Sequence, residues 1–322
     1  MRRAAGWIVV AVLVSGCPGA RPVRPAMQLP VAWRVGDRLS LEIARERTGV
    51  KRGQKESLGG GVFPVEVEVA SRTDDAYVLF WTYGSARLEG GPALTGPAAT
   101  FVKQLSTLLD GRRLVIGVTP LQGRTDIMNL DEVTAWYQQG FEAVHGSLVA
   151  ASMPPGEVRR LMATVGAYGK PESVAAASLE QPRLFLRFVG ARLEPGEVVE
   201  YDDQVVIDAR SGPVLARARY ELEAVDPARH EARIIWRRHV DRDAARASTL
   251  ALMKLMAEGA GKKPPRSADV LEIVIEDEGQ WVMDTASGWP VAVSFTRRWM
   301  TGDTGRVETT AMTARRQPSA KP

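Results

Sequence analysis

Two segments of the sequence share the form Asp-x-x-Ser-Gly, Asp208-Ala-Arg-Ser-Gly212 and Asp284-Thr-Ala-Ser-Gly288, so each offers a carboxylate and a hydroxyl that could bind a cation. A calcium loop of the EF-hand type, however, needs several more oxygen ligands than either segment supplies. An aspartate that caps backbone N–H groups, followed by a glycine in the left-handed region, is typical of hairpin turns. We therefore predict that both segments are turns between strands.

A second cluster, His239-Val-Asp241-Arg-Asp243, brings three potential metal ligands to the predicted end of a strand. Zinc would need at least one more fixed ligand. Asp243 is moreover expected to cap the helix that follows. The other two histidines, His145 and His230, are widely spaced in the sequence, which gives little support to a histidine-based triad. We predict no metal site and no cofactor.

Acidic residues are adjacent at Asp202-Asp203 and at Glu276-Asp277-Glu278. The first two would point to opposite faces of a strand, and the second cluster is expected at a solvated hairpin turn. Glycosidase chemistry depends on the separation of two carboxylates, which a sequence does not determine. The chain contains neither a Gly-x-Ser-x-Gly nor a Ser-x-x-Lys motif. Gly259-Ala-Gly-Lys-Lys263 lacks the spacing and the hydroxyl residue of a phosphate-binding loop. We predict no catalytic residues and no enzymatic activity, with an envelope hydrolase as the less favoured alternative.

Two tryptophans, Trp289 and Trp299, lie on a hairpin that is predicted near the C-terminus. Core packing is one explanation for them. The alternative is that they line a groove for an apolar or sugar ligand, because ligand sites are lined mainly by apolar and aromatic side chains. Trp81 and Trp236 recur at matching positions of two predicted repeats and are expected in the core.

The N-terminus begins with Arg2 and Arg3, continues with an apolar run over residues 7–14, and reaches small residues before Cys17. This order is typical of a secretory signal peptide, here residues 1–16. The segment Leu13-Val14-Ser15-Gly16-Cys17 resembles the lipobox of bacterial lipoproteins, and the resemblance implies cleavage after Gly16 and acylation of Cys17. A short N-terminal membrane anchor without lipid is the alternative. Cys17 is the only cysteine, which excludes disulfides, thiolate metal sites and cysteine catalysis from the exported part.

Residues 17–31 contain four prolines, which favour an extended tether between the membrane and the folded part. Pro18 stands where the sorting rule of Gram-negative lipoproteins places an aspartate for retention in the inner membrane. We therefore expect attachment to the outer membrane, facing the periplasm or the cell surface. Removal of Arg2 and Arg3 lowers the formal net charge of +4 by two, and no basic block is interleaved with aromatic residues. Nucleic acid is therefore not an expected partner.

The rest of the chain is predicted to be α+β and dominated by strands. Apolar residues alternate in the strand segments, and helices are expected at 98–110, 130–149 and 244–258. Four landmarks recur in the same order at offsets of 155 to 160 residues, and one of them pairs turns at Gly123 and Gly279. This predicts two repeated β–ββ–α–ββ halves that form curved antiparallel sheets with the helices on one side. The predicted units are an N-terminal half at 32–165, a linker at 166–182, a C-terminal half at 183–315 and a disordered tail at 316–322.

Short motifs over most of the mature chain are similar to those of an uncharacterised family of bacterial lipoproteins and secreted proteins. They are Trp33-Arg-Val-Gly-Asp37, the strand-Gly-strand segment at 114–129 with Leu130-Asp-Glu-Val133, Pro195-Gly-Glu197, and the ending at 281–288. The resemblance implies a duplicated, β-rich fold without an assigned activity. This chain departs from the family at Val198-Val199, where the family tends to keep an aromatic residue.

The favoured hypothesis is a lipid-anchored, non-enzymatic module of the cell envelope that binds or scaffolds another molecule. Its expected partners are the membrane, through the N-terminal lipid, and an envelope protein or an apolar ligand. The alternative is a carrier that holds an apolar ligand or lipid between a half-barrel sheet and the helices that cover it.

Overall fold

The structure is a computed structural model of the chain, which describes residues 26–91, 107–120, 123–150, 152–166, 169–206, 213–259, 263, 266 and 272–317. The predicted signal peptide, Cys17, most of the tether and most of the helix expected at 98–110 lie outside the described residues. In the part that is described, strands dominate and four helices are present. These helices are α2 (Leu130–Ala150), α3 (Pro155–Gly166), α4 (Pro171–Leu186) and α5 (Arg242–Gly259).

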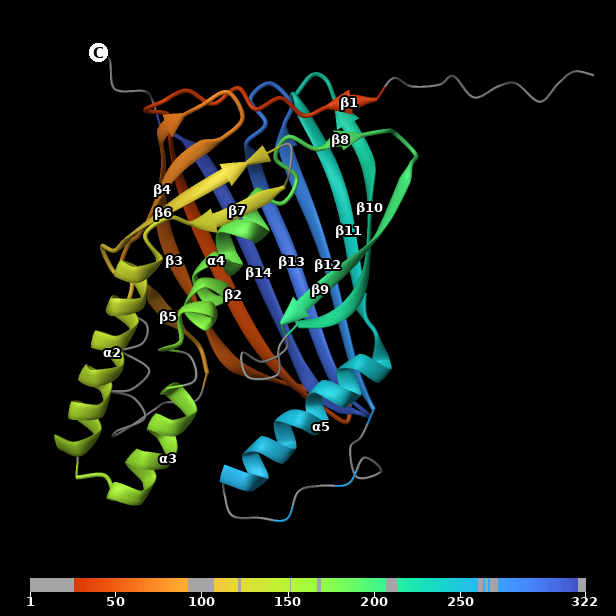
Figure 1. Ribbon diagram of the computed structural model, residues 1–322. Helices are drawn as coiled ribbons and strands as arrows, with labels where there is room; N and C mark the ends of the chain where they lie inside the picture. Colours follow the sequence, from red (N-terminus) through yellow and green to blue (C-terminus); the bar gives the residue numbers. More distant parts are fainter. Residues whose placement is uncertain are drawn as a thin grey trace, which may run out of the picture.

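One antiparallel sheet of 12 strands joins both halves of the chain (Figure 1). The strands of the N-terminal half are β2 (Arg38–Lys51), β3 (Gln54–Arg72), β4 (Tyr77–Tyr83), β5 (Arg87–Glu89), β6 (Arg113–Thr119) and β7 (Arg124–Ile127). Those of the C-terminal half are β9 (Val198–Val206), β10 (Pro213–Asp226), β11 (Glu231–Val240), β12 (Ile273–Asp284), β13 (Pro290–Thr301) and β14 (Thr304–Arg316). The strand-dominated antiparallel fold is thus confirmed.

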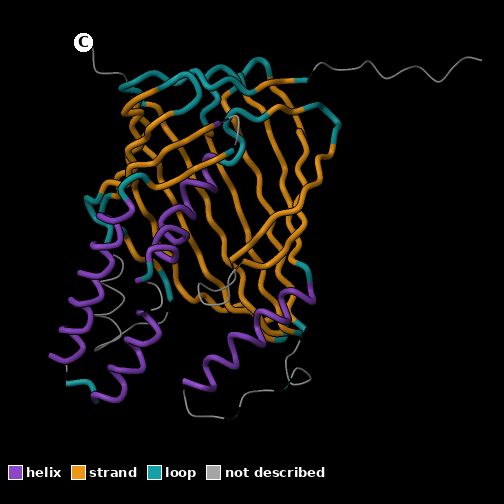
Figure 2. The backbone as a smooth tube through the Cα atoms, in the orientation of Figure 1, coloured by secondary structure: helices purple, strands orange, loops and turns teal. Residues whose placement is uncertain are grey.

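The strands follow the order β7-β6-β4-β3-β2-β14-β13-β12-β11-β10-β9, and β5 pairs with β3. The two halves meet where β14 pairs with β2, so they share one sheet rather than forming one sheet each. Two short strands, β1 (Met27–Gln28) and β8 (Arg192–Leu193), pair at one end of the molecule. Figure 2 shows the strands and loops surrounding α4, with α2, α3 and α5 toward the opposite end from β1.

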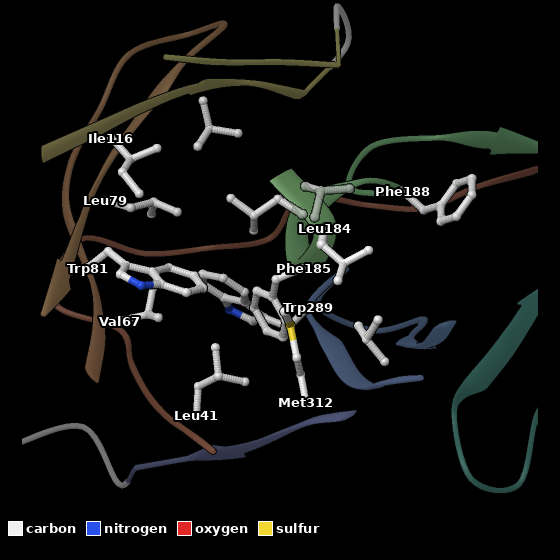
Figure 3. Close-up of a cluster of buried hydrophobic side chains, with 14 of the residues drawn as sticks. Leu41, Val67, Leu79, Trp81, Ile116, Leu184, Phe185, Phe188, Trp289 and Met312 are labelled. Atoms are coloured by element: carbon white, nitrogen blue, oxygen red, sulfur yellow. The ribbon is translucent and has the colours of Figure 1, made fainter. Parts of the chain in front are cut away.

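The strands bury the alternate side chains that the sequence pattern predicts. In β2, Leu39, Leu41 and Ile43 are buried. We call the sheet face that carries these residues and packs against α4 the inner face. Figure 3 shows Leu184 and Phe185 of α4 among the inner-face side chains, where the Phe185 ring meets that of Trp81 edge to face. Because large aromatic side chains remove the most apolar surface from water, this packing is a main source of stability.

Two of the repeat landmarks have matching environments, and one does not. Trp81 and Trp236 are both fully buried on the inner face. Gly36 and Gly196 both have positive φ before a long strand. Gly123, however, lies in the turn between β6 and β7, whereas Gly279 lies inside β12. The expected strand pair around Gly279 is therefore one continuous strand, and the duplication itself stays a prediction.

The segment expected as a linker at 166–182 contains most of α4, so the linker prediction is wrong. The small residues of this segment form part of a helix, and two of them, Ser173 and Ser178, are buried. Pro171 begins the helix, a position where its missing N–H and fixed φ are tolerated, and the alanines that follow are the best helix formers. Val174, Ser178 and Leu179 are buried against the rest of the protein.

Two other helix predictions agree with the structure in extent. The helices expected at 130–149 and 244–258 are α2 and α5. Asn129 precedes α2 and donates to Glu132, but its side-chain oxygen accepts from the backbone N–H of Val115 on the sheet. None of the described helices is long and apolar enough to cross a membrane.

Along β11, β12 and β13 the inner face has three levels. The first is the main apolar core, which includes Trp236, Trp281 and Val293. The third is a smaller apolar cluster beside α5, which includes Val240 and Ile275. The level between them carries charged side chains, and the candidate site lies there.

Candidate functional site

The segment that begins at Asp284 is a hairpin turn between β12 and β13, as predicted. The Asp284 carboxylate accepts hydrogen bonds from the backbone N–H of Ala286 at 2.9 Å and from the hydroxyl of Ser287 at 2.5 Å. Gly288 has a φ of 76°. Its partner segment at 208–212 lies outside the described residues. Asp284 is thus occupied in holding the turn.

Replacement of Gly288 by alanine is expected to destabilise the protein more than replacement of Gly36. Both glycines have positive φ, which for alanine costs about 1–2 kcal/mol. A Cβ on Gly288 would also collide with the carbonyl oxygen of Pro30, whereas one on Gly36 has open space. Overpacking of this kind adds about 1–3 kcal/mol. Urea-induced unfolding of the two variants measures the difference in stability. Equal losses of stability would contradict the close approach of Pro30 to Gly288.

The three potential metal ligands His239, Asp241 and Asp243 have different roles in the structure. His239 is exposed and faces Glu276 at 3.6 Å. Asp241, and not Asp243, caps α5, because its carboxylate accepts the backbone N–H of Ala244 at 2.8 Å. Among the residues that the structure describes, no group of three or more histidine, cysteine or acidic side chains could hold a metal ion.

The acidic pair Asp202-Asp203 lies as predicted, and the run of three at 276–278 does not. Asp202 and Asp203 point to opposite faces of β9, as predicted, because Asp203 contacts Arg238 on the inner face while Asp202 is exposed. The expectation of a solvated turn at Glu276-Asp277-Glu278 is wrong. These residues lie in the middle of β12, and the Asp277 side chain is 0% exposed.

Gly279 explains why the strand continues where a turn was expected. A Cβ at this position would stand 2.5 Å from the indole of Trp281 on the same strand. The glycine therefore makes room for a buried tryptophan.

Five residues with alternating charge occupy directly opposite positions on neighbouring strands, and we call them the charged row. They are Arg47 (β2), Glu308 (β14), Arg297 (β13), Asp277 (β12) and Arg238 (β11). Arg47 pairs with Glu308 at 3.0 Å. Directly opposite cross-strand residues are the closest side-chain neighbours in a sheet, so the alternation stabilises this register.

Asp277 is the centre of the row. Its carboxylate accepts from Arg238 at 2.5 and 3.0 Å and from Arg297 at 2.8 and 3.1 Å. Burial acts to raise the pKa of Asp277, but the hydrogen bonds and charges of Arg297 and Arg238 outweigh it, so the pKa is lowered. Asp277 is therefore a structural anion and not a candidate general acid.

A cleft of about 450 Å³ separates α4 from the charged row. One side comes from α4 and the other from β2, β9, β11, β13 and β14. Five arginines and three carboxylates line it. They are Arg45, Arg183, Arg187, Arg238 and Arg297, with Glu180, Asp203 and Glu308. The rest of the lining mixes small, polar and apolar side chains, among them Leu184, Val205 and Phe295.

Arg187, which follows the last residue of α4, is the unusual group of this cleft. Its guanidinium lies 4.3 Å from the ring centre of Trp236, and its Nη1 donates to the hydroxyl of Tyr201 at 3.3 Å. Its Nε is buried without a hydrogen-bond partner. Burial lowers the pKa of Arg187, and the nearby charge of Arg238 acts in the same direction, while Tyr201 and Asp203 act against them.

The two tryptophans predicted to line a groove lie near opposite ends of β13. Trp289 is 2% exposed and stacks on Trp33 with ring centres 3.8 Å apart, which places it in the core. Trp299 is partly buried against the smaller apolar cluster and has Arg306 over its ring. Among its described lining residues, the cleft contains neither of them.

Sequence reasoning missed Arg187, Arg238 and Asp277 as a group. A signal for two of them was present, because strict alternation puts Asp277 on the same face as Ile275, and Arg238 on the same face as Trp236. A charged residue in the apolar register of a strand is a sign of a buried ion pair or a site.

No protein-family model matches the chain, and no curated protein sequence matches it significantly. Two solved structures align with it at low identity. One is the structure from a study of lipid–protein interactions in lipovitellin. It aligns with 90% of this chain at 11% identity and a TM-score of 0.40. The other is an outer membrane channel from Pseudomonas putida F1, which covers 88% of this chain with 12% identity and a TM-score of 0.26. The chain spans 26% of the lipovitellin chain and 97% of the channel.

Proposed function

We propose that this protein is a lipid-anchored binding module of the bacterial cell envelope, whose ligand occupies the cleft between α4 and the charged row. The observation that carries the proposal is Arg187, a largely buried cation that lines the cleft and has no carboxylate partner among the described residues. The cleft volume of about 450 Å³ falls within the range of about 300–1,000 Å³ of small-molecule sites.

A non-enzymatic role fits the chemistry of the described lining. Its carboxylates are held in ion pairs, for example Glu180 with Arg45 at 3.5 Å and Asp203 with Arg238 at 2.8 Å. No histidine stands among the described residues of the cleft wall. These groups are suited to hold a ligand rather than to transfer a proton.

The location in the envelope rests on the resemblance of residues 13–17 to a lipobox. The described chain begins beside β1, at the end of the sheet where β1 pairs with β8 (Figure 1). Met27 and Gln28 form β1 and Leu29 is 1% exposed, so the tether prediction is wrong for residues 27–31, and only the part before residue 27 would lead away from the fold at this end. We propose attachment to the outer membrane of a Gram-negative bacterium through acylated Cys17.

The carrier alternative, a wholly apolar ligand between sheet and helices, has less support. The apolar part of the inner face is filled by side chains such as Trp81, Phe185 and Phe188 (Figure 3). The arginines of the cleft would lose hydration against a ligand without polar groups. A ligand with both polar and apolar parts suits this lining better.

The cleft can be tested with a variant that fills it. Ala177 on α4 lines the cleft and is exposed, so Ala177→Trp is expected to block it without disturbing the core. Native mass spectrometry of the full-length protein, purified from bacteria and released from detergent micelles, should detect a bound small molecule on the wild type and not on this variant.

The matched control is Ala143→Trp, the same substitution at an exposed position of α2 that does not line the cleft. It should retain the bound molecule. A ligand that survives Ala177→Trp as well as Ala143→Trp would place binding elsewhere and contradict the assignment of the site.

A further inference from the structure

The arginines of the cleft fall into two groups. Arg45, Arg238 and Arg297 each form an ion pair with a carboxylate. Arg183 donates instead to the backbone oxygen of Thr125, and Arg187 to the hydroxyl of Tyr201. In the described part of the chain, no carboxylate forms an ion pair with either of these two.

This arrangement is unfavourable without a ligand. Arg183 and Arg187 are one turn apart on the same helix, where like charges repel. Arg238 adds a third guanidinium, because it and Arg187 both lie over the ring of Trp236. The C-terminal end of a helix attracts cations, and stacking on tryptophan adds to this, so a purely structural role of Arg187 is the competing explanation. That role leaves the buried Nε without an acceptor.

The free edge of the guanidinium indicates which chemistry would satisfy it. Nη1 is bonded to Tyr201, and Nε has no partner, while Nη2 makes no hydrogen bond to a described residue. Nε and Nη2 together form the edge with which arginine binds the two oxygens of a carboxylate or phosphate. Leu184, Val205 and Phe295 supply apolar surface in the same cleft.

We propose that the ligand is an amphiphilic organic anion, whose carboxylate or phosphate binds the Nε–Nη2 edge of Arg187 and whose apolar part lies against Leu184, Val205 and Phe295. This inference rests on the proposed function, because it names the class of ligand for the same cleft. Arg187 is the anion receptor, whereas Arg238 is already paired with Asp203 and Asp277, and Arg297 with Asp277.

Titration calorimetry on the full-length protein in phosphatidylcholine nanodiscs tests the inference, with empty nanodiscs as the blank. The probes share an eight-carbon chain and differ in the head group: octanoate, octyl phosphate, octanol and octylammonium. Acetate and inorganic phosphate test the head group alone. We expect the two chain-bearing anions to bind more tightly than octanol, octylammonium and the small anions.

Arg187→Gln is expected to weaken octanoate binding by about 10- to 100-fold, the loss of hydrogen bonds to a charged group, and to leave octanol binding unchanged. Arg187→Lys should restore only part of the affinity, because an ammonium cannot form the two parallel bonds. Arg219→Gln is the control, since it removes the same charge from an exposed position outside the cleft, and it should bind octanoate like the wild type.

The stability of Arg187→Gln separates a receptor from a structural residue. A receptor predicts a urea midpoint close to that of the wild type with weakened octanoate binding, whereas a structural role predicts a lower midpoint with binding retained. If this variant does not fold, the comparison of octanoate with octanol on the wild type still tests whether the ligand is an amphiphilic anion.

Equal affinities for octanoate and octanol, or for octanoate and acetate, would overturn the amphiphilic anion. Unchanged octanoate binding by a folded Arg187→Gln would overturn the role of Arg187. Failure of the proposed function looks different, because then no probe binds the wild type above the empty nanodisc and no bound mass disappears with Ala177→Trp.

Discussion

Replacement of Asp277 by asparagine is expected to lower the free energy of unfolding by about 3–5 kcal/mol, the usual effect of removing one partner from a buried ion pair. The substitution keeps the shape of the side chain and removes its charge. Arg238 and Arg297 would then face each other across β12 with their shared anion gone. Since domains are stable by about 5–15 kcal/mol, this is a large fraction of the total. Urea-induced unfolding followed by tryptophan fluorescence measures it.

Glu278→Gln is the matched control, because Glu278 lies next to Asp277 on the same strand but on the opposite face. Its side chain is 59% exposed and pairs with Arg237 at 3.1 Å. Exposed pairs contribute about 0–1 kcal/mol, so this variant should be close to the wild type. Equal losses for the two variants would contradict the special role of the buried carboxylate.

The effect of Asp277→Asn should depend on pH in a defined direction. The pKa of Asp277 in the folded state is lowered from its ordinary value of 3.8. Its contribution is therefore complete above pH 3.8 and is lost as the pH falls through the lower pKa of the folded state. The difference between wild type and Asp277→Asn should be constant near neutral pH and shrink below pH 3.8. A stability difference between the two proteins that grows on acidification would contradict the lowered pKa of Asp277.

A double-mutant cycle isolates the contact of Asp277 with Arg297. The two residues are directly opposite on β12 and β13, and two hydrogen bonds join them. Residues in such contact couple by about 0.5–3 kcal/mol. The combined variant Asp277→Asn with Arg297→Gln should therefore lose less stability than the sum of the single variants.

The sequence predicted the strands well wherever one face is apolar and the other polar. Leu39, Leu41 and Ile43 in β2, and the alternating valines of β3, were sufficient because period-two alternation has one common physical cause, the burial of one sheet face. The turn at Asp284 was predictable for a similar reason, since its hydrogen bonds are local in the chain.

Features that depend on contacts between distant segments were not predictable in this way. Gly279 is a glycine because of the Trp281 indole, and no property of residues 276–279 alone distinguishes this from a turn. At 171–182 the helix signals are local, Pro171 followed by alanines, but the burial of Val174 and Leu179 depends on a sheet whose strands come from both halves of the chain.

The residues of the cleft could not be predicted for the same reason, because they meet through contacts between distant segments. Arg187 and Arg238 lie 51 positions apart, and only the pairing of β9, β10 and β11 beside α4 brings them over one indole. Local sequence shows each arginine as an ordinary basic residue. What distinguishes them is the carboxylate partner that Arg238 has and Arg187 lacks among the described residues, a property of the assembled sheet.

Replacement of Cys17 by serine is expected to abolish lipid attachment completely. Acylation needs the thiol, and Cys17 carries the only one in the chain. A serine cannot take the thioether-linked lipid, so the precursor should keep residues 1–16 and gain no acyl chains. Stable anchoring needs more than one hydrophobic chain, because a single acyl chain gives only marginal binding. Labelling with radioactive palmitate and the intact mass of the protein measure both effects.

The fold should be unaffected by this substitution, because the first described strand begins at Met27, ten residues beyond Cys17. Urea unfolding of Cys17→Ser should therefore match that of the wild type. Palmitate incorporation by the variant, or removal of residues 1–16 from it, would contradict the lipobox and favour the alternative of an N-terminal anchor without lipid.

Pro18→Asp separates lipid attachment from destination and is the companion variant. It leaves Cys17 in place, so labelling and cleavage should be those of the wild type. If the sorting rule of Gram-negative lipoproteins applies, the aspartate retains the protein in the inner membrane, whereas the wild type fractionates with the outer membrane. A variant that is labelled but does not move would leave the lipid anchor intact and overturn only the assignment to the outer membrane.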